Sequence, residues 1–97
     1  MNPEITTAIT HAWPELVELG VEHLDVFGSQ ARGTGDPQSD VDVLVHLRGQ
    51  GTLRALVAIR DRLTEILGRR VDVLTPGALA GRPRLRDRVL EGAVRVA

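Results

Sequence analysis

The chain has 97 residues, 42% of them hydrophobic and 26% charged, which is the balance of one small folded domain over residues 1–97. It has no cysteine, lysine or tyrosine, which excludes disulfides, thiolate metal sites and a Walker-type phosphate lysine. The net charge of −1 argues against direct nucleic-acid binding. With no apolar run of membrane-spanning length and no secretory signal, we expect a cytoplasmic protein without a membrane segment.

Hydrophobic spacing and turn residues divide the chain into alternating helices and strands. They predict, in order, a helix over 5–19, a strand over 24–27, a helical turn over 29–32, a loop over 33–39, a strand over 40–47, a helix over 53–67, a strand over 71–74 closed by a turn at 75–77, and a last helix over about 84–90. Pro14 predicts a kink or two short helices in the first segment. This order is typical of an α/β (α+β) fold with a small mixed sheet of three to four strands flanked by helices.

Two carboxylates open the predicted strand over 40–47. Asp40 and Asp42 are two residues apart, so both point to the same face of the strand. Carboxylates this close repel each other, which raises the pKa of one of them unless a cation neutralises the pair, and Mg²⁺ suits such oxygen ligands. If the preceding strand is antiparallel and the next one parallel, Asp72 reaches the same end of the sheet.

The end of the preceding strand supplies complementary chemistry. Gly28 lets a phosphate approach the backbone, and the amides from Ser29 onward, with the Ser29 hydroxyl, donate hydrogen bonds to phosphate oxygens. Three acidic ligands hold one or two Mg²⁺ ions that stabilise an in-line phosphoryl displacement. Together these parts indicate a site for a nucleoside triphosphate.

The runs Phe27-Gly28-Ser29-Gln30-Ala31-Arg32-Gly33 and Ser39-Asp40-Val41-Asp42-Val43-Leu44-Val45 resemble the signature of the minimal nucleotidyltransferases, in the DNA polymerase β-type nucleotidyltransferase superfamily. The resemblance covers essentially the whole chain. It implies a mixed-sheet core, ATP as substrate, Mg²⁺ as cofactor in the form of two ions, and transfer of a nucleoside monophosphate with release of pyrophosphate. It also implies that Asp40 and Asp42 bind both metals, that Asp72 binds the second metal and helps to activate the attacking hydroxyl, and that Gly28 and Ser29 cradle the triphosphate.

Stand-alone members resemble antitoxins that adenylylate a tyrosine of a HEPN-type ribonuclease toxin. Because this chain has no tyrosine, such an acceptor must lie on a partner in a hetero-complex. Two alternatives stay open: a non-catalytic antitoxin that acts by stoichiometric binding, and an antibiotic-type enzyme that modifies a small molecule.

Arg32 and Ser39 complete the predicted nucleotide-binding set. Arg32 contacts a phosphate or forms a salt bridge with Asp36, and Ser39 orients the loop before Asp40 or touches the substrate. His46 lies too far along the strand from Asp42 to share its metal, so we expect a partly exposed histidine.

Charge is distributed unevenly along the sequence. Residues 1–50 hold eight acidic residues and two arginines, whereas residues 51–97 hold five acidic residues and ten arginines. The basic run 82–88 is either a solvated helix face or a surface that attracts an acidic partner or nucleotide phosphates.

Overall fold

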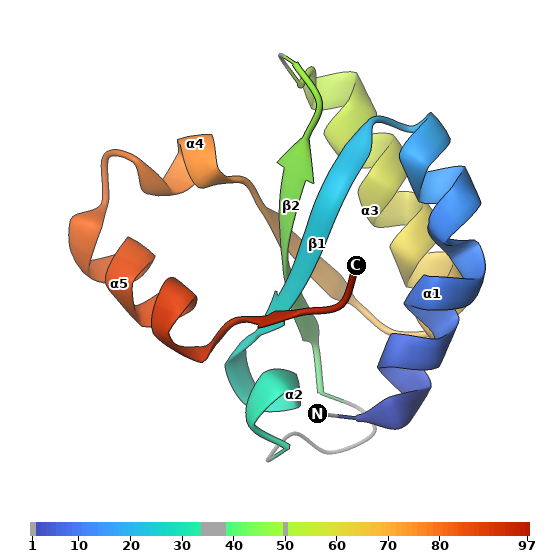
Figure 1. Cartoon of the computed structure of the whole chain (residues 1–97), viewed down its shortest axis with the longest axis horizontal. Coiled ribbons are helices and arrows are strands. Elements are labelled where there is room, and N and C mark those ends of the chain that lie inside the picture. Colours follow the sequence, from blue (N-terminus) through green and yellow to red (C-terminus); the bar gives the residue numbers. More distant parts are fainter. Residues whose placement is uncertain (1, 34–38, 50) are drawn as a thin grey trace.

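The computed structural model describes residues 2–33, 39–49 and 51–97, so most of the predicted loop over 33–39, including Asp36, lies outside the described residues. Helices and strands follow one another in the order shown in Figure 1. The elements are α1 (Pro3–Glu18), β1 (Val21–Phe27), α2 (Gly28–Arg32), β2 (Val41–Leu47), α3 (Leu53–Leu67), β3 (Val71–Leu74), α4 (Pro76–Leu79), α5 (Pro83–Gly92) and β4 (Val94–Arg95).

The strands form one mixed sheet in the order β3-β2-β1-β4. β1 pairs antiparallel with β2 and with β4, and β2 pairs parallel with β3. Helix α3 is the crossover that returns the chain to start the parallel strand, as such a connection requires. The predicted fold class and the predicted strand directions are therefore confirmed.

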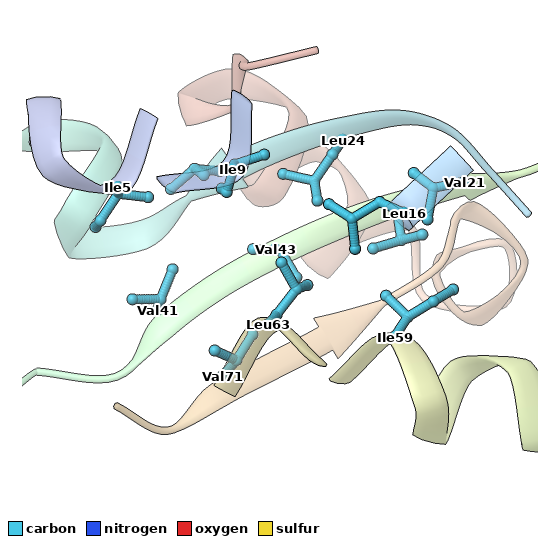
Figure 2. Packing of buried hydrophobic residues seen from close by; sticks show 12 residues of the cluster. Ile5, Ile9, Leu16, Val21, Leu24, Val41, Val43, Ile59, Leu63 and Val71 are labelled. Atoms are coloured by element: carbon cyan, nitrogen blue, oxygen red, sulfur yellow. The ribbon is translucent and has the colours of Figure 1, made fainter. Parts of the chain in front are cut away.

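Helices α1 and α3 lie together on one face of the sheet (Figure 1). The buried cluster between these layers combines alternate residues of the strands with one stripe from each helix (Figure 2). Its fully buried members include Ile5, Ile9, Leu16, Leu24, Val41, Val43, Ile59 and Leu63. The alternating valines of β2 supply this face, as the sequence predicts.

The opposite face of the sheet is covered in its centre by the C-terminal helices. Leu44 of β2 packs there with Leu79 of α4 and Val89 of α5, and Phe27 packs at the margin of this cluster. β2 is therefore buried on both faces at its middle, whereas its alternation predicted one apolar face. Helix α5 also contacts α2 and β1, so it lies beside the end of β1 at which Gly28 stands.

Three boundaries differ from the sequence prediction. α1 is one helix that includes Pro14 rather than two short helices, because Ile9, Ala12 and Leu16 are buried on both sides of the proline. β1 begins at Val21, three residues before the predicted start of the strand. Residues 75–77 form the beginning of α4 rather than a simple turn. Thr75 instead caps α4, its side chain accepting a hydrogen bond from the Ala78 amide. None of the described helices is long and apolar enough to cross a membrane.

Candidate functional site

Strand pairing brings two of the three predicted carboxylates together. Asp42 of β2 stands directly opposite Asp72 of β3 in the parallel ladder, as the strands' register requires. Asp42 is half-buried, whereas the Asp72 side chain is 48% exposed at the outer strand of the sheet. The two carboxylates thus share one end of one face, and Asp42 lies on the inner side of the pair.

Gly28 approaches Asp42 from the neighbouring strand. Phe27 is the register partner of Asp42, so Gly28 begins α2 just beyond the end of the ladder. Its φ is +71°, which favours glycine, and a Cβ at this position would lie 2.5 Å from Oδ2 of Asp42. Both the backbone conformation and the space beside the carboxylate therefore require glycine at the point where a substrate would approach.

The surroundings of Asp42 disfavour its charged form. Burial, followed by the negative charges of Asp72 and Asp40, raises the pKa of Asp42 above its ordinary value. The positive charge of Arg32 offsets part of this effect. The repulsion expected from the sequence is therefore present, and a cation bound here would relieve it.

Arg70, which the sequence analysis did not single out, lies between the carboxylates of Asp40 and Asp72. Nε of Arg70 is 3.7 Å from Oδ1 of Asp72 and 4.0 Å from Oδ2 of Asp40. Arg70 precedes Asp72 by two positions at the start of β3, and this spacing is the signal that could have placed both side chains on one side. The Arg70 side chain is 77% exposed, so these long contacts are open to water and are easily displaced.

The other predicted nucleotide-binding residues lie near this end of the sheet. Arg32 is exposed in the last turn of α2, and its charge reaches Asp42. Ser29 in α2 and Ser39 before β2 are half-buried, and both already have interactions within the chain. The salt bridge expected between Arg32 and Asp36 involves a residue outside the described part of the chain.

The donor chemistry of the three aspartates suits Mg²⁺, because all are hard oxygen ligands and their charges repel one another. Across the part of the chain that the structure describes, no three acidic or histidine side chains are grouped closely enough to hold a metal ion as they stand. Arg70 lies where a cation would compete for Asp40 and Asp72. The residues therefore fit a magnesium site in ligand type, and the guanidinium supplies the positive charge beside them.

A second charged group lies on the same sheet face, and its carboxylate is two positions further along the strands from Asp42. Asp25 of β1 is 6% exposed; its Oδ1 accepts a hydrogen bond from Nε of Arg95 at 2.9 Å, and its Oδ2 accepts one from Nε2 of His46 at 3.0 Å. His46 is half-buried, in agreement with the predicted partial exposure, and it has this structural partner. The sequence did not reveal the group, because its three members come from three strands.

Comparison with known proteins gives a consistent result. Residues 9–96 match the model of the nucleotidyltransferase domain family. A relative from Methanocaldococcus jannaschii that carries the name of a protein adenylyltransferase is 41% identical over 83 residues, which cover 86% of this chain and 87% of the relative.

Solved structures agree with the sequence matches. A structure described as a minimal nucleotidyltransferase is 34% identical and superposes with a TM-score of 0.77, covering 91% of this chain and 88% of the other. A chain in the structure of a tri-AMPylated Shewanella oneidensis HEPN toxin with an MNT antitoxin has the same fold. It is 15% identical, with a TM-score of 0.60 over 91% of this chain and 71% of that chain.

Proposed function

This chain belongs to the nucleotidyltransferase domain family, and from that premise we propose that it transfers AMP from ATP to a hydroxyl group of a partner protein. One observation carries the proposal: Asp42 stands opposite Asp72, with the backbone of Gly28 against its carboxylate. A pair of carboxylates that suits a cation thus lies beside the end of β1, where Gly28 has no side chain to obstruct a triphosphate. The name of the 41% identical relative supports a protein as the acceptor.

In this proposal each predicted site residue has one task. Asp40, Asp42 and Asp72 hold magnesium, as one or two ions, and when bound the metal neutralises charge that develops on the phosphate oxygens. The Gly28 backbone leaves room for the triphosphate, and Ser29 donates to it. Arg32 and Ser39 complete the nucleotide-binding set, with Arg32 reaching phosphate from the end of α2.

The transfer forms one bond and breaks one bond. The acceptor hydroxyl oxygen bonds to the α-phosphorus of ATP, and the bond from that phosphorus to the oxygen bridging to the β-phosphate breaks. Pyrophosphate leaves with the electron pair of this bond. The hydroxyl proton passes to the carboxylate of Asp72, which is the more exposed member of the opposed pair and so faces the approaching acceptor.

The partner in this proposal is a HEPN-type ribonuclease toxin, which the chain inactivates as an antitoxin in a cytoplasmic hetero-complex. The solved complex of a HEPN toxin with an MNT antitoxin supports this choice through its fold. The absence of tyrosine from this chain fits an acceptor tyrosine on the partner. Stoichiometric binding and transfer to a small molecule are the competing functions.

Labelled ATP separates these functions. The chain, its co-purified partner, Mg²⁺ and ATP labelled at the α-phosphate are mixed, and protein-bound label is followed with partner ribonuclease activity. Label on the partner together with loss of ribonuclease activity is the expected result. Silencing without label would establish stoichiometric binding, and label confined to small molecules would establish the antibiotic-type activity.

A thermal melt tests the nucleotide site without a partner. Because the carboxylates repel one another, Mg²⁺ and ATP together should raise the melting temperature more than either alone. No shift at saturating concentrations of both would count against this site.

A further inference from the structure

An open surface cavity of about 570 Å³ lies beside Asp72, between the C-terminal half of α3 and the start of β3. Its lining includes Arg60, Asp61, Thr64, Arg69, Arg70 and Asp72. β3 is an outer strand of the sheet, with β2 on its other side. The cavity therefore adjoins the carboxylate cluster on the side away from Gly28.

Arg69 is a half-buried residue on the lining of the cavity. Nη1 of Arg69 is buried and has no hydrogen-bond partner, and Arg69 forms no ion pair within the described residues. A buried unpaired donor is costly, so native proteins leave few of them without a function. Arg62 of the neighbouring helix α3 shows the usual arrangement, with hydrogen bonds of 2.6 and 2.9 Å to the Glu15 carboxylate.

The two other arginines of the cavity are weakly engaged. Nη2 of Arg60 is 3.3 Å from Oδ1 of Asp61, in a pair whose side chains are 52% and 65% exposed. Arg70 makes the long contacts to Asp40 and Asp72 described above. Three guanidinium groups thus surround a cavity with two carboxylates on its lining, and the hydroxyl of Thr64 adds a further donor. This chemistry fits an oxyanion.

We propose that this cavity binds an oxyanion carried by the acceptor, next to the hydroxyl that reacts. The inference rests on the proposed function, because it assigns the two sides of Asp72 to the two substrates. The nucleotide occupies the side of Gly28 and Asp42, and the acceptor approaches Asp72 across the outer strand. Arg60, Arg69 and Arg70 are then specificity-determining residues for the acceptor.

Two groups supply the same oxyanion chemistry. One is the carboxylate of an acidic residue beside the acceptor residue. The other is the phosphodiester left by an earlier transfer, in which case a ribose hydroxyl of the attached nucleotide attacks the next ATP. The first acts in every transfer, whereas the second acts only from the second transfer onward.

Variants of the cavity distinguish these sources. Arg69→Gln and Arg60→Gln are compared with wild type in transfer to the co-purified partner, with mass spectrometry counting the nucleotides added at each time. Loss of a charged hydrogen bond should raise the acceptor KM about 10–100-fold without changing the KM for ATP. Arg69→Lys should restore part of the loss. Arg54→Gln is the matched control, because Arg54 is an exposed residue of α3 that does not line the cavity.

The stage that slows identifies the oxyanion. A slower first transfer establishes the carboxylate, and a normal first transfer with slower later ones establishes the phosphodiester. Normal kinetics at every stage in both folded variants, with wild type active, overturns the proposal.

A titration separates this inference from the proposed function. Inorganic phosphate is added to the ¹⁵N-labelled chain alone, and amide shifts are followed. Shifts around residues 60–72 that disappear in Arg69→Gln are expected even if no transfer is ever detected. If wild type transfers nothing and phosphate shifts none of these amides, both proposals fail. If wild type transfers AMP, phosphate shifts none of these amides and the cavity variants have normal kinetics, only the proposal for the cavity fails.

Discussion

Asp25 and Asp42 lie on the same face of the sheet, and their environments act on their charge in opposite directions. Asp25 stands opposite Leu44, which is two positions from Asp42 on β2 and therefore shares its face. Burial by itself raises the pKa of Asp25, but hydrogen bonds from Arg95 and His46, and their charges, outweigh it and lower the pKa below its ordinary value. At Asp42, burial and two further carboxylates act together to raise the pKa.

The difference separates a charge that stabilises the fold from a charge whose ionisation the fold opposes. The Asp25 carboxylate is neutralised by groups of the chain itself, so it joins β1, β2 and β4. The Asp42 carboxylate is left among like charges, a state that persists because the surrounding strands are held by apolar packing. Carboxylates of the second kind, whose pKa is raised by burial and by like charges, are typical of functional sites.

The largest effect is expected from Asp42→Asn, which keeps the size of the side chain and removes its charge. Transfer of label from ATP should fall by about 10³-fold or more, because an aligned cation could no longer be held beside the reacting phosphate. Binding to the partner should persist, since the core face of β2 is unchanged. The measurement is label transfer at matched complex concentration.

Asp25→Asn is the matched control for this loss, because it makes the same chemical change on the same face. Its transfer rate per folded molecule should equal that of wild type. A partner that is silenced as completely by Asp42→Asn as by wild type, with no label transferred, would contradict the catalytic role and support stoichiometric binding.

The arginines of α5 extend the comparison to unpaired positive charge. Arg84, Arg86 and Arg88 are exposed and, within the described residues, form no ion pair, whereas Arg95 is paired with Asp25. If they meet an acidic partner, changing all three to Glu should slow association by about tenfold or more and weaken its salt dependence.

Stopped-flow association across a salt series tests this prediction, with circular dichroism checking that α5 is retained. Arg54→Glu is the control for reversal of a charge at an exposed position outside this run. Association unchanged by the triple substitution at every salt concentration would leave the run 82–88 as a solvated helix face.

The sequence predicted the parts of the molecule that local pattern determines. Alternating valines placed β2, the Gly68 cap ended α3, and the Gly-Ser and Asp-x-Asp spacing located the carboxylate cluster. It did not predict the Asp25 group, whose members are 21 and 70 residues from Asp25. Arg70 was missed although its two-residue spacing from Asp72 places both side chains on one side. The cavity at Arg69 was missed because it depends on how a helix end and an outer strand pack, which no short motif encodes.

Asp25→Asn itself should lower the free energy of unfolding by about 1–3 kcal/mol, the typical cost of removing hydrogen bonds to a charged group. The neutral amide leaves Arg95 and His46 without their anion at a site that joins three strands. Urea unfolding at neutral pH measures the loss. A free energy of unfolding equal to that of wild type would mean that the group contributes nothing to stability.

The smallest effect is the pH dependence of the two variants, and it tests the comparison directly. The pKa of Asp42 is raised in the folded chain, so its ionisation opposes folding above that pKa, and the cost disappears below the ordinary value of about 3.9. Asp42→Asn should therefore be more stable than wild type at neutral pH, with a higher melting temperature, and this gain should shrink as the pH falls. The pKa of Asp25 is lowered in the folded chain, so the stabilisation that its charge gives the fold is complete above the ordinary pKa. This stabilisation is lost only as the pH falls through the lowered pKa.

Melting temperatures of both variants, measured from about pH 3 to 8, should thus differ from wild type with opposite signs. As the pH falls, the difference for Asp42→Asn should begin to vanish at a higher pH than the difference for Asp25→Asn. Differences of the same sign at neutral pH would show that the two carboxylates are not held in opposite states.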